Sequence, residues 1–116
     1  MPATLLQLRD ALREFAAARD WDQFHSPRNL AAALAVEAAE LLEPFQWLDD
    51  EQSRNLPAET RAAVEEELAD VLLYLVRLAD KLEVDLVRAA ERKIACNAAK
   101  YPVETSRGSS RKSTLL

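Results

Sequence analysis

Two pairs of acidic residues have the types and spacing to do chemistry in this sequence: Glu37 with Glu40, and Glu67 with Asp70. Three-residue spacing in a helix places both members of a pair on one face, about 60° apart. A helical projection puts Glu37 in the middle of an apolar stripe. The stripe contains Leu30, Ala33, Leu34 and Leu41. A carboxylate at this position is expected to face the core of the protein.

Several like charges facing one interior are unfavourable unless the acids protonate, pair with bases or bind a cation. Nearby basic residues are too few to pair with them. A donor set of carboxylate oxygens, without cysteine or histidine, selects a hard ion such as Mg²⁺, with Mn²⁺ as a possible substitute. Spacing alone is weak support, because most such pairs lie on solvated faces. We interpret Glu43 and Glu65–Glu66 in that way.

These acids must be positioned by helices. Apolar periodicity and capping residues predict helices over about 4–19, 27–43, 57–83 and 86–101, with a short turn over 49–56. The long third helix carries an apolar seam, which consists of Val64, Leu68, Val71, Leu75, Leu78 and Leu82. We therefore expect an all-α fold: a compact bundle of four main helices in one domain over 1–102, with a flexible, polar and basic tail over 103–116. A chain this small is expected to complete its core by oligomerisation.

Composition excludes several function classes. The single glycine, Gly108, lies in the tail, so no glycine-rich nucleotide loop is present. The net charge of -5 argues against nucleic-acid or membrane-surface partners. The charge is uneven: residues 1–86 carry 8 basic and 18 acidic side chains, whereas residues 87–116 carry 7 basic and 2 acidic. The lone Cys96 and the lack of a signal peptide or membrane span favour a reducing, cytoplasmic setting.

Longer segments resemble a known family. The acids lie in Glu37-Ala-Ala-Glu40 and Glu67-Leu-Ala-Asp70, with 26 residues between the two segments. With the D-W-x-Q-F-H-x-P-R-N segment over 20–29, F-Q-W over 45–47 and N-A-A-K-Y-P over 97–102, the pattern resembles the MazG-like all-α nucleoside triphosphate pyrophosphohydrolases. Within that family, the enzymes that act on dCTP are the most similar, and the similarity covers nearly the whole chain.

The resemblance implies a catalytic, Mg²⁺-binding set made of Glu37, Glu40, Glu67 and Asp70. It implies hydrolysis of dCTP, and of modified dCTP analogues, to the monophosphate and pyrophosphate by attack of water at the α-phosphorus, in nucleotide-pool sanitation. Metal and carboxylate together suit that chemistry, because phosphate charge must be neutralised and the water needs a base. Glu40 is our choice of base.

Aromatic and polar residues on the connectors and the later helices are candidate substrate contacts. From the residues alone, the aromatic side chains anchor loops, Tyr74 packs in the core and Asn97 is a hydrogen-bonded core amide. The resemblance instead makes them contacts to base, sugar or phosphate. The implied set is Trp21, Asp22, Gln23, Phe24, His25, Trp47, Tyr74, Lys93 and Asn97, followed by Lys100, Tyr101, Arg111 and Lys112.

Two positions depart from the family pattern: Ala38-Ala39 stands where relatives have Val-Gly, and Leu12 stands where they have histidine. Leu12 puts strict preference for cytosine in doubt, so another or broader nucleotide preference is an alternative. A different alternative is a helical oligomerisation module without activity, which leaves Glu37 unexplained. A di-iron bundle would need E-x-x-H pairs, which are missing. The family resemblance further implies a homo-oligomer built as a dimer of dimers.

Overall fold

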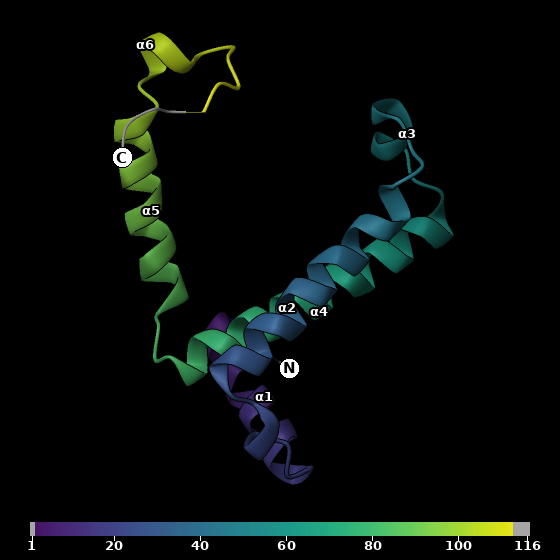
Figure 1. Ribbon diagram of the computed structural model, residues 1–116, viewed down its shortest axis with the longest axis vertical. Helices are drawn as coiled ribbons and strands as arrows, with labels where there is room; N and C mark the ends of the chain where they lie inside the picture. Colours follow the sequence, from purple (N-terminus) through teal and green to yellow (C-terminus); the bar gives the residue numbers. More distant parts are fainter. Residues whose placement is uncertain (1, 113–116) are drawn as a thin grey trace. The chain divides into compact units, whose positions relative to one another are not determined.

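The structure is a computed structural model in which residues 2–112 are described. Within that range it contains helices and no strand (Figure 1). The elements are α1 Leu5–Ala18, η1 Asp22–Phe24, α2 Pro27–Leu42, η2 Glu43–Phe45, α3 Asp50–Arg54, α4 Ala58–Lys81, α5 Leu86–Lys100 and α6 Val103–Ser106, where η marks a 3-10 helix. The predicted all-α class with four main helices is confirmed.

Capping residues set the helix ends where the sequence predicts them. The Ser26 side chain accepts a hydrogen bond from the Asn29 backbone, with Pro27 at the first helical position of α2. Asp49 caps α3 in a capping box with Gln52, and Asp85 caps α5. Each cap satisfies backbone donors that a helix leaves without partners.

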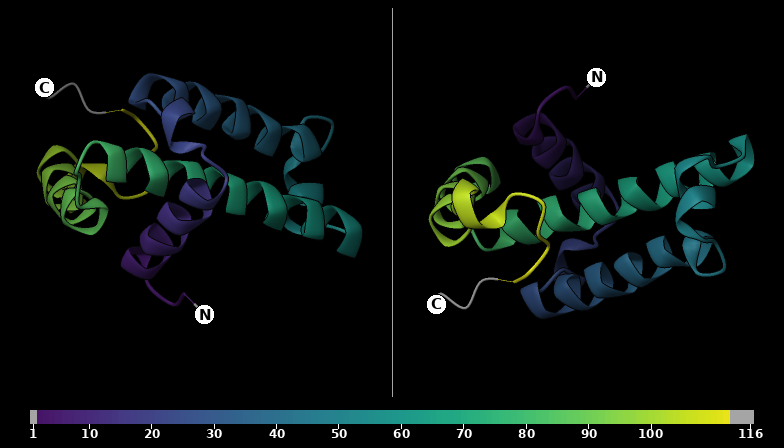
Figure 2. Two further views of the ribbon diagram at one scale, coloured as in Figure 1. Left: turned by 90° about the horizontal axis from the view of Figure 1, so that it is seen from below. Right: turned by 90° about the horizontal axis from the view of Figure 1, so that it is seen from above.

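The chain divides into two compact units, Met1–Glu83 and Val84–Leu116. In the first unit, α2 and α4 lie side by side and run in opposite directions (Figure 1), and α1 packs on another side of α4 (Figure 2). The buried apolar residues are Ala16, Leu30, Val64, Val76 and Ala79. Helix α4 is therefore the centre of this unit, and it carries half of the predicted acidic set.

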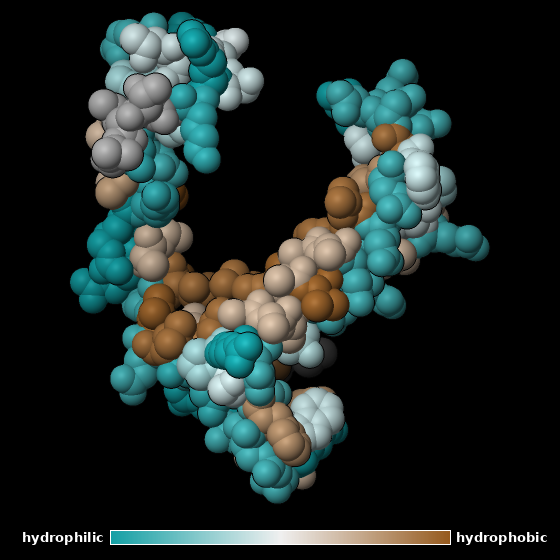
Figure 3. All heavy atoms as spheres, in the orientation of Figure 1, coloured by the Kyte–Doolittle hydropathy of each residue, from teal (hydrophilic) through white to brown (hydrophobic). Residues whose placement is uncertain are grey.

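The predicted apolar seam on α4 is only partly covered within the first unit. Val64 is buried, whereas Leu68 is 51% exposed, Leu75 37% and Leu82 54%. Figure 3 shows apolar surface along α2 and α4. Within this unit, α1 and α2 cover only two sides of α4, so these three leucines are not fully covered. Completion of the core by oligomerisation stays a prediction.

The second unit contains α5 and α6. On α5, Ile94 is 68% exposed, Ala90 is also exposed and Leu86 is half-buried. The one-turn helix α6 begins the segment predicted as a tail, and residues 113–116 of that segment lie outside the described range. The single domain over 1–102 stays a prediction. Within the described residues, no helix combines the length and apolar character needed to cross a membrane.

Candidate metal centre

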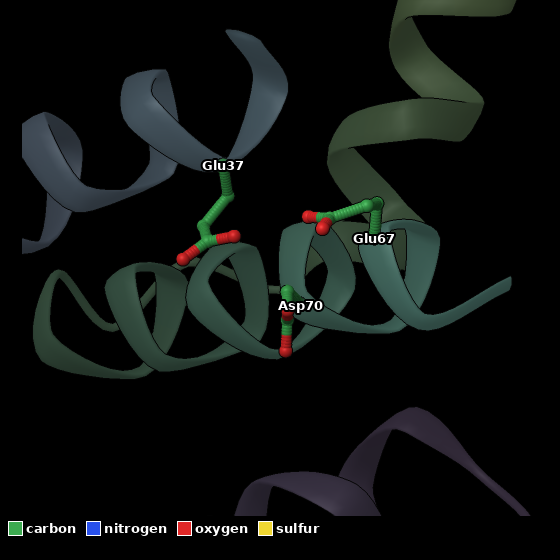
Figure 4. Close-up of side chains that lie close together, drawn as sticks. All are labelled: Glu37, Glu67 and Asp70. Carbon is green, nitrogen blue, oxygen red and sulfur yellow. The ribbon is translucent and has the colours of Figure 1, made fainter. Parts of the chain in front are cut away.

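Three of the four predicted carboxylates converge between α2 and α4. Glu37 points from α2 toward α4, where Glu67 and Asp70 lie one turn apart (Figure 4). Each residue has a carboxylate oxygen within 4.8 Å of an oxygen of the other two. Glu40, one turn after Glu37, is half-buried and outside this closest group. Antiparallel packing of α2 on α4 thus unites two acidic pairs that are far apart in sequence.

Two oxygens of this cluster are buried without a hydrogen-bond partner. They are Oε2 of Glu37 and Oε2 of Glu67, and they are the buried side-chain polar atoms left unpaired within residues 2–112. A buried acceptor without a partner is unfavourable and calls for a ligand or a proton.

Burial and crowding raise the pKa of two carboxyls. The pKa of Glu37 rises from 4.5 to about 7, first because of burial, then because of hydrogen bonding to the Glu40 carboxyl and the nearby negative charges. The pKa of Glu67 is also raised, by burial first and then by the charges of Glu40 and Asp70. The charge of Glu40 on α2 thus acts on Glu67 on α4, so Glu40 belongs electrostatically to the cluster although it lies outside the closest three.

These residues fit a divalent cation. The donors are oxygens alone, the three carboxylates lie close together, two of their oxygens are buried without a partner, and a positive ion would offset the repulsion that raises both pKa values. Glu37, Glu67 and Asp70 would hold the ion, with Glu40 beside it. A hard ion such as Mg²⁺ or Mn²⁺ matches this donor chemistry.

The aromatic residues predicted to contact substrate differ in their exposure and in their packing against other rings. Trp47, which follows η2, is 86% exposed, and Phe24 is also exposed. Trp21 packs edge-to-face against Phe15 and His25, with ring centroids 5.7 and 6.5 Å apart. Trp47 therefore presents a large apolar surface to solvent, whereas Trp21 belongs to a small aromatic cluster at the end of α1.

Asp22 and Gln23, both predicted as substrate contacts, are used within the chain. Asp22 Oδ1 accepts hydrogen bonds from Arg77 Nη2 and Lys81 Nζ, both at 2.5 Å. Gln23 Nε2 donates to the backbone oxygen and a carboxylate oxygen of Asp20. Both side chains anchor their segment in this structure, and their role as substrate contacts stays a prediction.

Sequence reasoning missed the ion pairs that connect η1, α1 and α4. Besides the bonds to Asp22, Arg77 Nε donates to His25 Nδ1 at 3.1 Å, and Arg13 pairs with Asp80. A signal was available: Arg77 and Lys81 are four residues apart, so they share a helix face, and Arg77 interrupts an otherwise apolar run on α4.

The remaining predicted residues lie on α4 or in the second unit. Tyr74 is half-buried on α4, one turn beyond Asp70. Lys93, Asn97 and Lys100 lie on α5, Tyr101 follows that helix, and Arg111 and Lys112 are exposed. The participation of these second-unit residues in the site stays a prediction.

Comparison with known proteins identifies the family. The profile of the MazG-like family matches residues 32–116, a range that includes all four acids. The chain belongs to the MazG-like family.

Named proteins are similar to this MazG-like chain over most of its length. It is 50% identical to dCTP pyrophosphatase 1 of Mus musculus over 97% of the chain and 68% of that protein, and 49% identical to the Homo sapiens protein with the same coverage. A crystal structure of a pyrophosphatase from Archaeoglobus fulgidus superposes with a TM-score of 0.81 at 41% identity, over 88% of this chain and 95% of the other. Both the family and the helical fold expected from the resemblance are confirmed.

Proposed function

We propose that this chain hydrolyses dCTP to dCMP and pyrophosphate with a divalent metal ion, Mg²⁺ in the first instance. The observation that carries the proposal is the convergence of Glu37, Glu67 and Asp70, with two unpaired buried oxygens, in a chain that belongs to the MazG-like family. The two mammalian relatives, 49% and 50% identical, are named dCTP pyrophosphatase 1. The substrate class follows from those names, and the chemistry from the carboxylates.

The carboxylates divide between two roles. Glu37, Glu67 and Asp70 hold the metal, which when bound neutralises phosphate oxygens and the pyrophosphate leaving group. Glu40 lies beside these three residues and acts on both Glu37 and Glu67 electrostatically. Its carboxylate is therefore near the proposed metal ligands without belonging to the closest three. We assign Glu40 as the base that takes a proton from the water attacking the α-phosphorus.

Recognition of base and sugar belongs to the first unit's aromatic residues in this proposal. Trp47 offers an exposed ring face on which a nucleobase can stack, and Phe24 offers a second exposed ring. We assign Tyr74, one turn beyond Asp70 and half-buried, to the deoxyribose. The basic side chains Lys93 and Lys100 supply charge for the triphosphate, with Asn97 as an amide donor and the Arg111–Lys112 segment as a further cationic contribution.

The working form of the enzyme in this proposal is a cytoplasmic homo-oligomer, a dimer of dimers. Its support is the apolar surface of α4, where Leu68 and Leu75 lack a covering element within the first unit. A second copy of the chain would cover this surface and bury the leucines. Nucleic acid is not a partner in this proposal, because the acidic first unit would repel it.

The test is product analysis with isotope labelling. Incubation with dCTP and Mg²⁺ in ¹⁸O-water should yield dCMP that carries ¹⁸O and unlabelled pyrophosphate, because water attacks the α-phosphorus. Glu37→Gln and Asp70→Asn should abolish turnover while circular dichroism stays helical. Glu65→Gln, on the exposed side of α4, is the matched control and should retain activity. Release of dCDP and orthophosphate, or label in pyrophosphate, would contradict the mechanism.

Base preference is tested separately. Comparison of kcat/KM for dCTP, dTTP, dUTP, dATP and a 5-substituted dCTP should show dCTP and its analogue preferred. Equal values across the panel would replace the dCTP assignment by a broad nucleotide preference, the alternative that Leu12 raises.

A further inference from the structure

Arg77 is the one charged side chain that is buried within the described residues, at 6% exposure. A buried guanidinium is unfavourable unless its donors are paired. Here Nη2 donates to Asp22 Oδ1 at 2.5 Å, Nε donates to His25 Nδ1 at 3.1 Å, and Nη1 lies 3.6 Å from Asp80 Oδ2. One rigid, planar group therefore connects α4 to Asp22 and to His25, which lie on the segment that also carries Trp21.

The contact with Arg77 decides where the His25 imidazole carries its proton. Nδ1 accepts the hydrogen bond from Arg77 Nε, so in the neutral ring the proton lies on Nε2. A second proton on Nδ1 would remove the acceptor of this hydrogen bond and place a positive imidazolium next to the positive guanidinium. The charged groups that face the ring are Arg77 and Lys81 from α4 and Asp22 from η1.

The same surroundings keep the ring neutral. Burial, then the positive charges of Arg77 and Lys81, lower the pKa of His25 below its ordinary 6.5, and Asp22 offsets this in part. The ring therefore offers a neutral N–H donor at Nε2 near pH 7. Its neighbour Trp21 packs edge-to-face against it, so the position of the His25 ring bears on that of the Trp21 ring.

We propose that Arg77 is a positioning residue: it holds His25 in the tautomer that donates from Nε2, and it holds the Trp21–His25 segment in place for an acceptor atom on the nucleotide. The claim about the nucleotide contact rests on the proposed function, whereas the claim about the His25 tautomer is independent of it. Arg77 itself does not contact substrate in this assignment. Asp22 is the anchor through which the guanidinium holds the segment.

The tautomer is measured directly, because His25 is the one histidine of the chain. In ¹⁵N-histidine-labelled full-length protein at pH 7.5, Nδ1 should give the shift of an unprotonated ring nitrogen and Nε2 that of a protonated one. The spectrum of the unmutated protein thus decides the first claim without any variant. A proton on Nδ1, or fast averaging between the tautomers, would overturn it.

Arg77→Lys separates geometry from charge. Lysine keeps the positive charge but lacks the planar set of donors that reaches Asp22 and His25 together. We expect loss of the single tautomer, a His25 pKa still below that of free histidine, and a rise in KM for dCTP of about tenfold with kcat less affected, as for one lost hydrogen bond. Arg77→Met should in addition return the pKa toward 6.5.

Lys81→Met is the matched control. Lys81 is the other cation that donates to Asp22, and no hydrogen bond joins it to His25 in the described structure. It should keep the Nε2–H tautomer. An unchanged His25 spectrum in Arg77→Lys would overturn the proposal, and so would an altered spectrum with an unchanged KM. If the unmutated protein does not hydrolyse dCTP, the proposed function fails, and the histidine spectrum still decides the Arg77 contact.

Discussion

Binding of a divalent metal should release a proton from the Glu37 carboxyl. Without the ion, burial and neighbouring carboxylates raise the pKa of Glu37 from 4.5 to about 7, so this group is protonated in mildly acidic solution. A metal ion binds the carboxylate and not the carboxylic acid, so the proton must leave as the ion enters. Metal affinity is therefore expected to depend on pH in the range where ordinary glutamates do not titrate.

The size of the effect follows from the pKa. With a value of about 7, Glu37 is roughly nine-tenths protonated at pH 6 and roughly one-tenth protonated at pH 8. Binding should thus release about 0.9 proton at pH 6 and about 0.1 at pH 8 from this group, and apparent affinity should fall about tenfold for each pH unit below 7. Glu67, whose pKa is raised for similar reasons, adds to the release.

Calorimetric titration with MgCl₂ or MnCl₂ measures this release, because the apparent heat changes with the protonation enthalpy of the buffer. Two buffers at pH 6 and two at pH 8 give the number of protons at each pH. Glu37→Gln should bind metal more weakly and release fewer protons, whereas Glu65→Gln, an exposed neighbour on α4, should match the unmutated protein. Metal affinity that is constant from pH 6 to pH 8, with no buffer-dependent heat, would refute the assignment.

The same pKa predicts how the metal-free protein responds to pH. The folded-state value of about 7 lies above the ordinary 4.5, so the stability that Glu37 contributes is complete below pH 4.5 and is lost as the pH rises through 7. In EDTA, Tm should therefore fall between pH 5 and pH 8. Added Mg²⁺ should restore Tm most at pH 8, where the carboxylate is ionised.

Three further predictions concern other parts of the molecule. Asp80→Asn should lower the free energy of unfolding by about 2 kcal/mol in urea titrations at pH 7, because it removes the bidentate partner of Arg13. The pKa of Asp80 is lowered below 3.8 by this partner, so the stability that Asp80 contributes is present above pH 3.8. That stability disappears as the pH falls through the lowered pKa. Trp47→Ala should raise KM for dCTP by about fivefold to a hundredfold through lost stacking, with stability changed by less than about 0.5 kcal/mol because the side chain is exposed. Leu75→Lys should convert an oligomer into smaller species in light scattering, because a charge would enter the covered apolar surface.

Each of these three has a control in the same chain. Asp10→Asn removes a surface partner of Arg13 and should change stability by less than about 1 kcal/mol; an equal loss in both variants would contradict the role of Asp80. Trp47→Phe keeps an aromatic face and should retain most affinity. Leu6→Lys, at an exposed position of α1, should leave the oligomer intact. A single-chain mass for the unmutated protein would contradict the oligomer.

Much of the fold could be predicted from the sequence because its helices are defined locally. Ser26 with Pro27, Asp49 with Gln52, and Asp85 each act within one turn of chain, so their capping roles follow from residue type and spacing. The acidic pairs could be predicted for the same reason, since three-residue spacing fixes which face of a helix both members occupy.

The tertiary structure decided what meets across helices. The rotation of α2 against α4 brings Glu37 to Glu67 and Asp70 and leaves Glu40 beside them, a distinction that helical spacing cannot make. Packing of η1 and the residue after it on α4 also buries Arg77 against His25 and brings Asp22 into a hydrogen bond with α4. The physical reason is that spacing along one helix fixes angles about its own axis, whereas contacts between helices depend on how their surfaces pack. The sequence by itself thus determined the helices and the acids, and packing decided which acids converge and which charges hold the loop.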